Sequence, residues 1–290
     1  MILIEGIVMC FVLLIICVVG IANGPVGLVV FYEQEVKDRV VALGLTTKEK
    51  IQKTSIITVI ALFVPMIVLV PLMVYGIIRH IFVTHKHIDH LLGIIWIVRM
   101  ICQFMDHGEY KGEAYIYSHG EVLSLIRYMA GKLLREKEAA FVDDRLHLVE
   151  VTDGETREII GHETTFFDIR STKAKQFGFR MDIGNGEMLT CCGDEPLAPA
   201  VERYALGSKW MLHEAFCLYS QADVFDPYEK HHSTVKDACE LAERLGVKRL
   251  LLYHTEDQNL SNRKELYSQE GMQYFHGSLW IPDDLEVLTL

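Results

Sequence analysis

The pattern of hydrophobic and polar positions divides the chain into two parts. Residues 6–32 and residues 55–78 contain no charged side chain. Each run is longer than the roughly 20 apolar residues that cross the hydrocarbon core of a bilayer. We therefore expect two transmembrane helices, at about 6–31 and 54–78, which form a membrane hairpin over residues 1–78. The alternative is a helical hairpin buried in a globular core, which charge-free runs of this length disfavour.

The loop between the two runs and the cysteines give opposite indications of membrane orientation. Five Lys and Arg residues between 37 and 53 favour a cytoplasmic loop, which would put the C-terminal part outside. The seven cysteines have no regular spacing and form no CxxC pair, which indicates reduced thiols in a cytosolic domain. We predict a multi-pass membrane protein with its C-terminal domain in the cytoplasm, and the sequence leaves the orientation open.

From residue 79 onward, short apolar strands alternate with amphipathic helices. This pattern predicts an α/β domain over residues 79–290. Thr234 and Asp237 have the spacing of a capping box at the start of the helix at 235–245. The predicted strands lie at 81–83, 114–117, several places between 145 and 193, and 248–253, and the other predicted helices lie at 91–105 and 120–135.

The net charge limits which partners this domain can bind. The chain carries −11 in total, and the residues after 79 carry −12. This balance excludes a broad basic face for nucleic acid, although it leaves room for a local basic patch.

A cluster of metal-ligand side chains follows the first strand of the domain. In Thr84-His85-Lys86-His87-Ile88-Asp89-His90, His85 and His87 project to one side of an extended segment. Asp89 and His90 follow where the chain turns toward a helix. Four such side chains within six residues suit a pair of closely spaced cations. The alternative is a chance group of histidines on a solvated turn.

Other strands of the domain also end in histidine or a carboxylate. Asp194 follows an apolar strand through a Gly-Asp turn, and His254 follows the strand at 248–253. His213 and Glu214 close another apolar segment, and His232 comes just before the capped helix. Each residue alone is ordinary, but metal sites collect at the same end of neighbouring strands, so the repetition favours one shared site.

These motifs resemble those of metallo-β-lactamase-fold hydrolases. The segment THKHIDH is similar to their HxHxDH signature, and GDEP, LHEAF and HHSTVKDACELAERLGVKRLLLYH resemble the ribonuclease Z branch. The resemblance covers residues 79–290. It implies an αββα sandwich, two divalent metals (Zn²⁺, with Mn²⁺ or Fe²⁺ as alternatives), a phosphodiester substrate such as RNA, and a homodimer.

The resemblance also assigns the residues. His85 and His87 would bind the first metal, Asp89, His90 and His254 would bind the second, and Asp194 would bridge the two. The implied catalytic residues are Asp89, His232, Glu214 and His213. Two cations would lower the pKa of a water and stabilise charge on a phosphate, while neutral His232 would donate to the leaving oxygen. The rival functions are hydrolysis of another ester or of a cyclic nucleotide, and an inactive interaction module.

Two departures from the family pattern modify these expectations. The family supplies a third histidine to the first metal, but residues 166–173 contain none, and Arg170 stands at the expected place. A guanidinium cannot ligate a cation, so we expect a weak or empty first site unless His162 or a water substitutes. The family also has strands before HxHxDH, where this chain has its apolar runs. We therefore expect an N-terminally truncated hydrolase, joined to a foreign membrane hairpin and left with an unpaired sheet edge.

Overall fold

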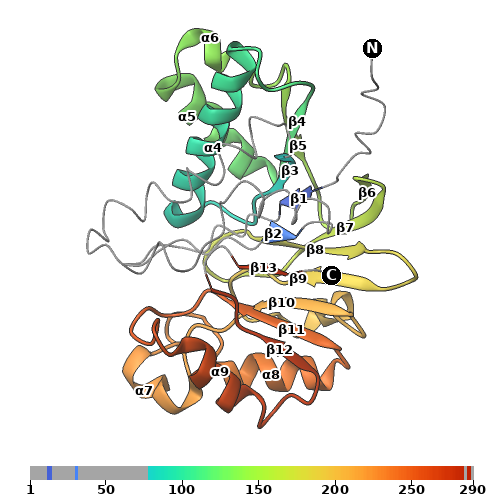
Figure 1. Ribbon diagram of the computed structural model, residues 1–290, viewed down its shortest axis with the longest axis vertical. Helices are drawn as coiled ribbons and strands as arrows, with labels where there is room; N and C mark the ends of the chain where they lie inside the picture. The colour runs from blue at the N-terminus through green and yellow to red at the C-terminus, as the bar shows by residue number, and fades with distance from the viewer. Residues whose placement is uncertain (1–11, 15–29, 32–77, 284–285, 289–290) are drawn as a thin grey trace, which may run out of the picture.

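The computed structural model describes residues 12–14, 30–31, 78–283 and 286–288. Two β-sheets pack face to face and helices cover their outer faces, which is the αββα arrangement that we predicted (Figure 1). The first sheet has the order β13 (Val287–Leu288), β2 (Val30–Phe31), β1 (Val12–Leu14), β3 (Ile78–Phe82), β4 (Ala114–Ser118) and β5 (Leu146–Glu150). The second has the order β12 (Ser278–Trp280), β11 (Arg249–Tyr253), β10 (Trp210–Glu214), β9 (Met188–Cys191), β8 (Phe177–Asp182), β7 (His162–Asp168) and β6 (Thr156–Ile159).

The helices form two separate groups in the sequence and in space. Those that follow β3 and β4 lie beside the first sheet, and those between β9 and β12 lie beside the second (Figure 1). The first group is α4 (Ile88–Asp106), α5 (Gly120–Leu133) and α6 (Glu136–Ala139). The second group is α7 (Ala222–Phe225), α8 (Val235–Arg244) and α9 (Arg263–Gly271), with the short 3₁₀ helices η1 (Pro199–Tyr204) and η2 (Tyr219–Gln221).

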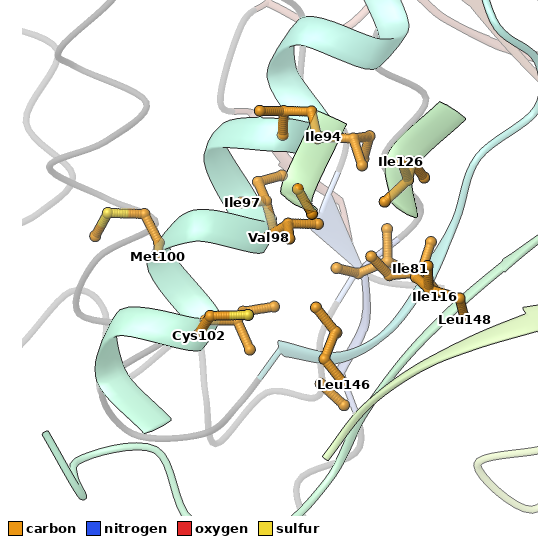
Figure 2. Close-up of a cluster of buried hydrophobic side chains, with 14 of the residues drawn as sticks. Ile81, Ile94, Ile97, Val98, Met100, Cys102, Ile116, Ile126, Leu146 and Leu148 are labelled. Carbon is orange, nitrogen blue, oxygen red and sulfur yellow. The ribbon is translucent and has the colours of Figure 1, made fainter. Parts of the chain in front are cut away.

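Alternation of side chains along each strand builds the three apolar layers. In β4, Ile116 points toward α4 and α5, where it packs with Ile94, Val98 and Ile126 (Figure 2). Its neighbour Tyr117 points the other way, into the layer between the two sheets. Successive strand residues point to opposite faces, so one strand serves two layers. The same alternation in β10 and β11 separates the inter-sheet core from the core under α8 and α9.

Most predicted elements of the domain are confirmed, with shifted boundaries. The helix that we expected at 91–105 begins earlier, at Ile88, so Asp89 and His90 belong to its first turn. A carboxylate in the first turn is stabilised by the positive end of the helix dipole. The capping box between Thr234 and Asp237 is present, with both reciprocal hydrogen bonds. The five cysteines of the described segments are buried thiols, as the irregular spacing predicted.

The predicted membrane hairpin lies largely outside the described residues. Where the structure describes that segment, Val12–Leu14 and Val30–Phe31 are strands, so helix 6–31 is wrong at those five positions. β1 pairs in parallel with β3, on the side opposite β4. The unpaired edge that we expected at β3 is therefore also wrong, because β1 satisfies its backbone groups.

One described helix is long and apolar enough to cross a membrane. It is α4, and 61% of its most apolar window is buried inside the fold.

The carboxyl ends of strands from both sheets meet at one edge. In the second sheet β9, β10 and β11 are parallel, and in the first sheet β3 and β4 are parallel. A backbone hydrogen bond from Phe177 N to Thr84 O (3.0 Å) joins the start of β8 to the end of β3. The residues that follow these strands are thereby brought together from distant parts of the sequence.

Candidate functional site

Asp194 lies at the centre of the cluster. Its Oδ2 atom is 3.3 Å from Nε2 of His85, 3.3 Å from Nε2 of His90 and 3.8 Å from Nε2 of His254. Burial alone would raise the pKa of this carboxyl. The hydrogen bond with His90 and the neighbouring imidazoles nevertheless hold that pKa well below its usual range. Asp194 is therefore an anion that faces three rings from three parts of the chain.

The ring of His85 is held in a form suited to ligation. Its Nδ1 lies 3.0 Å from the Thr84 hydroxyl, which leaves Nε2 to face the site. That Nε2 lies 2.8 Å from Nδ1 of His87. Burial, followed by the charge of His90, lowers the pKa of His85 to about 2. The ring is therefore neutral, and neutral imidazole is the form that binds metals.

His85, His87 and Asp194 form a group whose donor atoms all lie within 4.8 Å of one another. Two imidazoles and one carboxylate are a donor set that suits a borderline divalent cation. The sequence argument assigned Asp194 as the bridging ligand but found no third histidine for His85 and His87, so it treated this position as weak or empty. The structure places Asp194 beside both histidines, and this group of three contains no third histidine.

Arg170 and His162 do not reach the cluster. Arg170 has a left-handed backbone (φ 65°), and its exposed guanidinium pairs with Asp153 and Asp168. His162 stands at the start of β7, with Nδ1 on the Asp182 carbonyl, at the end of the strand far from residues 169–176. This agrees with the expectation that Arg170 offers no donor to the first metal, because its guanidinium pairs with two carboxylates away from the cluster.

Asp89 and His90 reach the site from the first turn of α4. His90 Nε2 lies 3.5 Å from Asp89 Oδ2 and 3.3 Å from Asp194 Oδ2. His254 follows β11 with a left-handed backbone (φ 56°), a conformation that costs about 1 kcal/mol or more for a residue with a Cβ. Such strain is common at functional sites, and here it comes where the chain delivers a ring beside Asp194.

A second group of donors adjoins the first. Glu214, His232 and His254 have donor atoms within 4.8 Å of one another. Glu214 Oε2 lies 3.6 Å from Nδ1 of His232, and its Oε1 accepts a hydrogen bond from Ser233 N. Burial raises the pKa of Glu214 to about 7. Burial, with the charge of Lys173, lowers the pKa of His232 to about 4.

Three atoms of this second group have no hydrogen-bond partner among the described residues. They are Glu214 Oε2, His232 Nδ1 and His254 Nδ1, and all three are buried. Buried polar atoms in native proteins are almost always bonded to protein, water or a ligand. Together with the donor chemistry of the first group, these atoms fit a site that holds a cation and its waters.

His213 is not brought together with the other candidates. It is the neighbour of Glu214 in β10, so its side chain points to the opposite face of the sheet, toward the α8 layer. Its ring is fully buried, and Nδ1 lies 2.6 Å from the Glu214 carbonyl. The sequence pair His-Glu suggested two site residues, but the geometry of a strand allows only one of them to face the cluster.

The loop at 169–176 supplies two residues that the sequence analysis missed. Lys173 Nζ lies 3.2 Å from Nε2 of His232. Gln176 is fully buried and bonds to Asp194 through both its side-chain oxygen and its side-chain nitrogen. Glu195 anchors the loop by accepting a hydrogen bond from the Ser171 hydroxyl (2.6 Å). Neither Lys173 nor Gln176 stands in a motif, so no local sequence signal identifies them.

Comparisons with known proteins agree with this fold and with these motifs. Residues 71–255 match the family described as "Beta-lactamase superfamily domain". A ribonuclease Z of Shouchella clausii is 32% identical over 105 residues, which are 36% of this chain and 32% of that protein. A ribonuclease Z of Brevibacillus brevis is 26% identical over 259 residues, which cover 72% of this chain and 79% of that protein. The first match thus spans about a third of the relative's length.

A solved structure extends the likeness to the fold. The metallo-β-lactamase fold protein YhfI of Bacillus subtilis superposes with a TM-score of 0.55 at 16% identity, and the match covers 71% of this chain and 75% of that chain. At this identity the likeness shows the fold alone.

Proposed function

The chain belongs to the β-lactamase superfamily, and from that premise we propose that it is a metal-dependent phosphodiesterase with a ribonuclease Z-like reaction. The observation that carries the proposal is the position of Asp194. One of its carboxylate oxygens faces His85, His90 and His254, while Glu214 and His232 lie directly beside this group. Donors for cations and a pair of proton-transfer groups therefore share one edge of the fold.

The residues suited to hold divalent cations divide into two sets around Asp194. His85 and His87 form one set with it, and the other set contains Asp89, His90 and His254, of which His90 and His254 lie within 4 Å of Asp194 Oδ2. Nitrogen and carboxylate donors suit Zn²⁺, with Mn²⁺ and Fe²⁺ as alternatives. When bound, such cations lower the pKa of a coordinated water and offset the negative charge on a phosphate.

His232 is the group best placed to move a proton at the leaving oxygen. Its Nδ1 faces the Glu214 carboxyl and its Nε2 faces outward beside Lys173. A proton added at Nε2 would give an imidazolium, and the Glu214 carboxyl beside Nδ1 would stabilise its charge. Burial and the charge of Lys173 hold the pKa of the resting ring at about 4, so the ring is neutral near pH 7 until the negative charge of a bound phosphate raises that pKa.

Lys173 supports a phosphate substrate in particular. Its ammonium lies beside His232 at the exposed side of the cluster, in a chain whose net charge is −11. A fixed positive charge at this point would favour an anionic substrate over a neutral ester. RNA is the substrate that we propose, since the curated relatives of this chain include ribonucleases Z.

Metal stoichiometry and substrate range test the proposal. Elemental analysis of the purified wild-type chain should find at least about one divalent metal per chain, and bis-p-nitrophenyl phosphate and a 3′-extended RNA should be hydrolysed in preference to a thioester or a β-lactam. Asp194→Asn preserves the size of the side chain and should lose most of the metal, while Asp153→Ala, which removes an exposed partner of Arg170, should retain it. Metal content that is unchanged in Asp194→Asn would refute the site, and preference for a thioester would refute the phosphodiesterase assignment.

A further inference from the structure

We propose that Gln176 is a positioning residue that fixes the rotation of the Asp194 carboxylate, so that a single oxygen faces the histidines. The inference rests on the proposed metal-dependent function. Gln176 Nε2 donates to Asp194 Oδ1 (2.5 Å), and Asp194 N donates to Gln176 Oε1 (2.6 Å). The amide thus holds both the side chain and the backbone of one residue.

The two hydrogen bonds determine which way the amide points. Its oxygen accepts from an N–H group and its nitrogen donates to a carboxylate. A flipped amide would place donor against donor and acceptor against acceptor, so only one orientation satisfies all four atoms. Because Gln176 is fully buried, no water competes for these bonds.

This clamp has a direct effect on the donor atoms. The terminal torsion of an aspartate is broad, so a free carboxylate would present either oxygen, or both, to a cation. With Oδ1 bonded to Gln176, Oδ2 alone lies toward His85 and His90, at 3.3 Å from each. Outer hydrogen bonds of this kind commonly change metal affinity about 10–100-fold when they are removed.

The backbone beside Gln176 fixes the other side of the cluster. Gln176 O accepts from Ile169 N (3.0 Å), which closes the loop, and the next residue, Phe177, donates its N–H to Thr84 O (3.0 Å). Thr84 in turn positions His85 through its hydroxyl. One short segment therefore sets the position of Asp194 through a side chain and of His85 through the backbone.

Gly193 packs against the Gln176 amide in a backbone conformation that favours glycine. Its φ is +84°, and a Cβ at this position would lie 2.1 Å from Gln176 Oε1. A side chain there would displace the amide as well as strain the backbone. Gly193 and Gln176 are therefore complementary, and Gly193→Ala perturbs the same clamp from the opposite side.

The experiment measures Zn²⁺ affinity by chelator competition and the visible spectrum of the Co²⁺-loaded chain. Gln176→Leu removes both hydrogen bonds at similar size, and Gln176→Glu keeps the acceptor for Asp194 N but places a carboxylate against a carboxylate. Both should weaken Zn²⁺ binding about 10–100-fold and alter the Co²⁺ spectrum. Gly193→Ala should shift both readouts in the same direction, and Gln269→Leu, at an exposed position on α9, should leave both unchanged.

Thermal unfolding of the metal-free variants separates positioning from folding. Metal-free Gln176→Glu that melts near the wild type yet binds Zn²⁺ more weakly supports the role. Wild-type affinity and an unchanged Co²⁺ spectrum in Gln176→Leu and Gln176→Glu would overturn it, while the proposed function would stand. A wild-type chain that binds no metal would overturn the proposed function, and this role with it.

Discussion

Lys173→Met should reduce turnover of an RNA substrate by weakening a contact with its phosphate. The Lys173 ammonium lies 3.2 Å from Nε2 of His232, the atom that we assign to the leaving oxygen. A phosphate about 4 Å from that charge would gain roughly 1 kcal/mol in the dielectric of water and about 4 kcal/mol at an effective dielectric of 20. Because Lys173 is exposed, the lower figure applies. The expected loss in kcat/KM is therefore about 5–10-fold.

Salt dependence gives the sharper measurement of this contact. Each Lys–phosphate contact contributes about one unit to the slope of log affinity against log salt concentration. KM for the RNA substrate, measured from about 50 to 300 mM KCl, should lose roughly one unit of slope in Lys173→Met. Lys248→Met is the matched control, since Lys248 is exposed at the amino end of β11, on the opposite edge of the sheet.

Two results would refute the reasoning about Lys173. One is an unchanged salt slope together with an unchanged kcat/KM, because the ammonium would then not contact the substrate. The other is an equal loss in Lys248→Met, because the effect would then come from net charge and not from the position of Lys173.

Three further predictions follow from the structure. Burial and the charge of Arg79 lower the pKa of His80 from 6.5 to about 4, so the unfolded chain binds this proton first on acidification. After a discount for partial exposure, the wild type should therefore lose about 2 kcal/mol of unfolding free energy between pH 6.5 and 4. His80→Phe preserves the ring stacking on Tyr115 and should lack this loss in urea titrations. Equal pH dependence of the unfolding free energy in both proteins would contradict the prediction. Arg170→Ala should change Zn²⁺ affinity less than twofold by chelator competition, because its guanidinium pairs with Asp153 away from the cluster, and a larger change would restore it as a site residue. The second apolar run, at 55–78, predicts that the chain sediments with membranes after a carbonate wash, and its release into the supernatant would count against attachment to a bilayer.

The parts of the site that could be predicted are those encoded by short, local spacing. His85, His87, Asp89 and His90 follow one strand and enter one helix, so periodicity alone brings them together. Asp194 and His254 could be added because each follows an apolar strand, and parallel strands end at a common edge.

The remaining features depend on backbone detail that composition does not carry. The sequence shows that Arg170 replaces a family ligand, but not that its backbone is left-handed or that Asp153 and Asp168 hold its side chain away from the cluster. His213 and Glu214 are adjacent, and both are plausible site residues by chemistry. The alternation of side chains along β10 decides which of them faces the cluster. Gln176 acts through two hydrogen bonds to a residue 18 positions away, a relation that no spacing rule identifies.

The pairing of His90 with Asp194 also bears on how the chain folds. These residues are 104 positions apart: His90 lies in the first turn of α4, beside the first sheet, and Asp194 follows β9 of the second sheet. A cation held by both in the folded chain and released on unfolding would stabilise the fold by its binding free energy. Because the two sheets could not separate without loss of these bonds, the bound cation would slow unfolding and join the two halves of the domain into one cooperative unit.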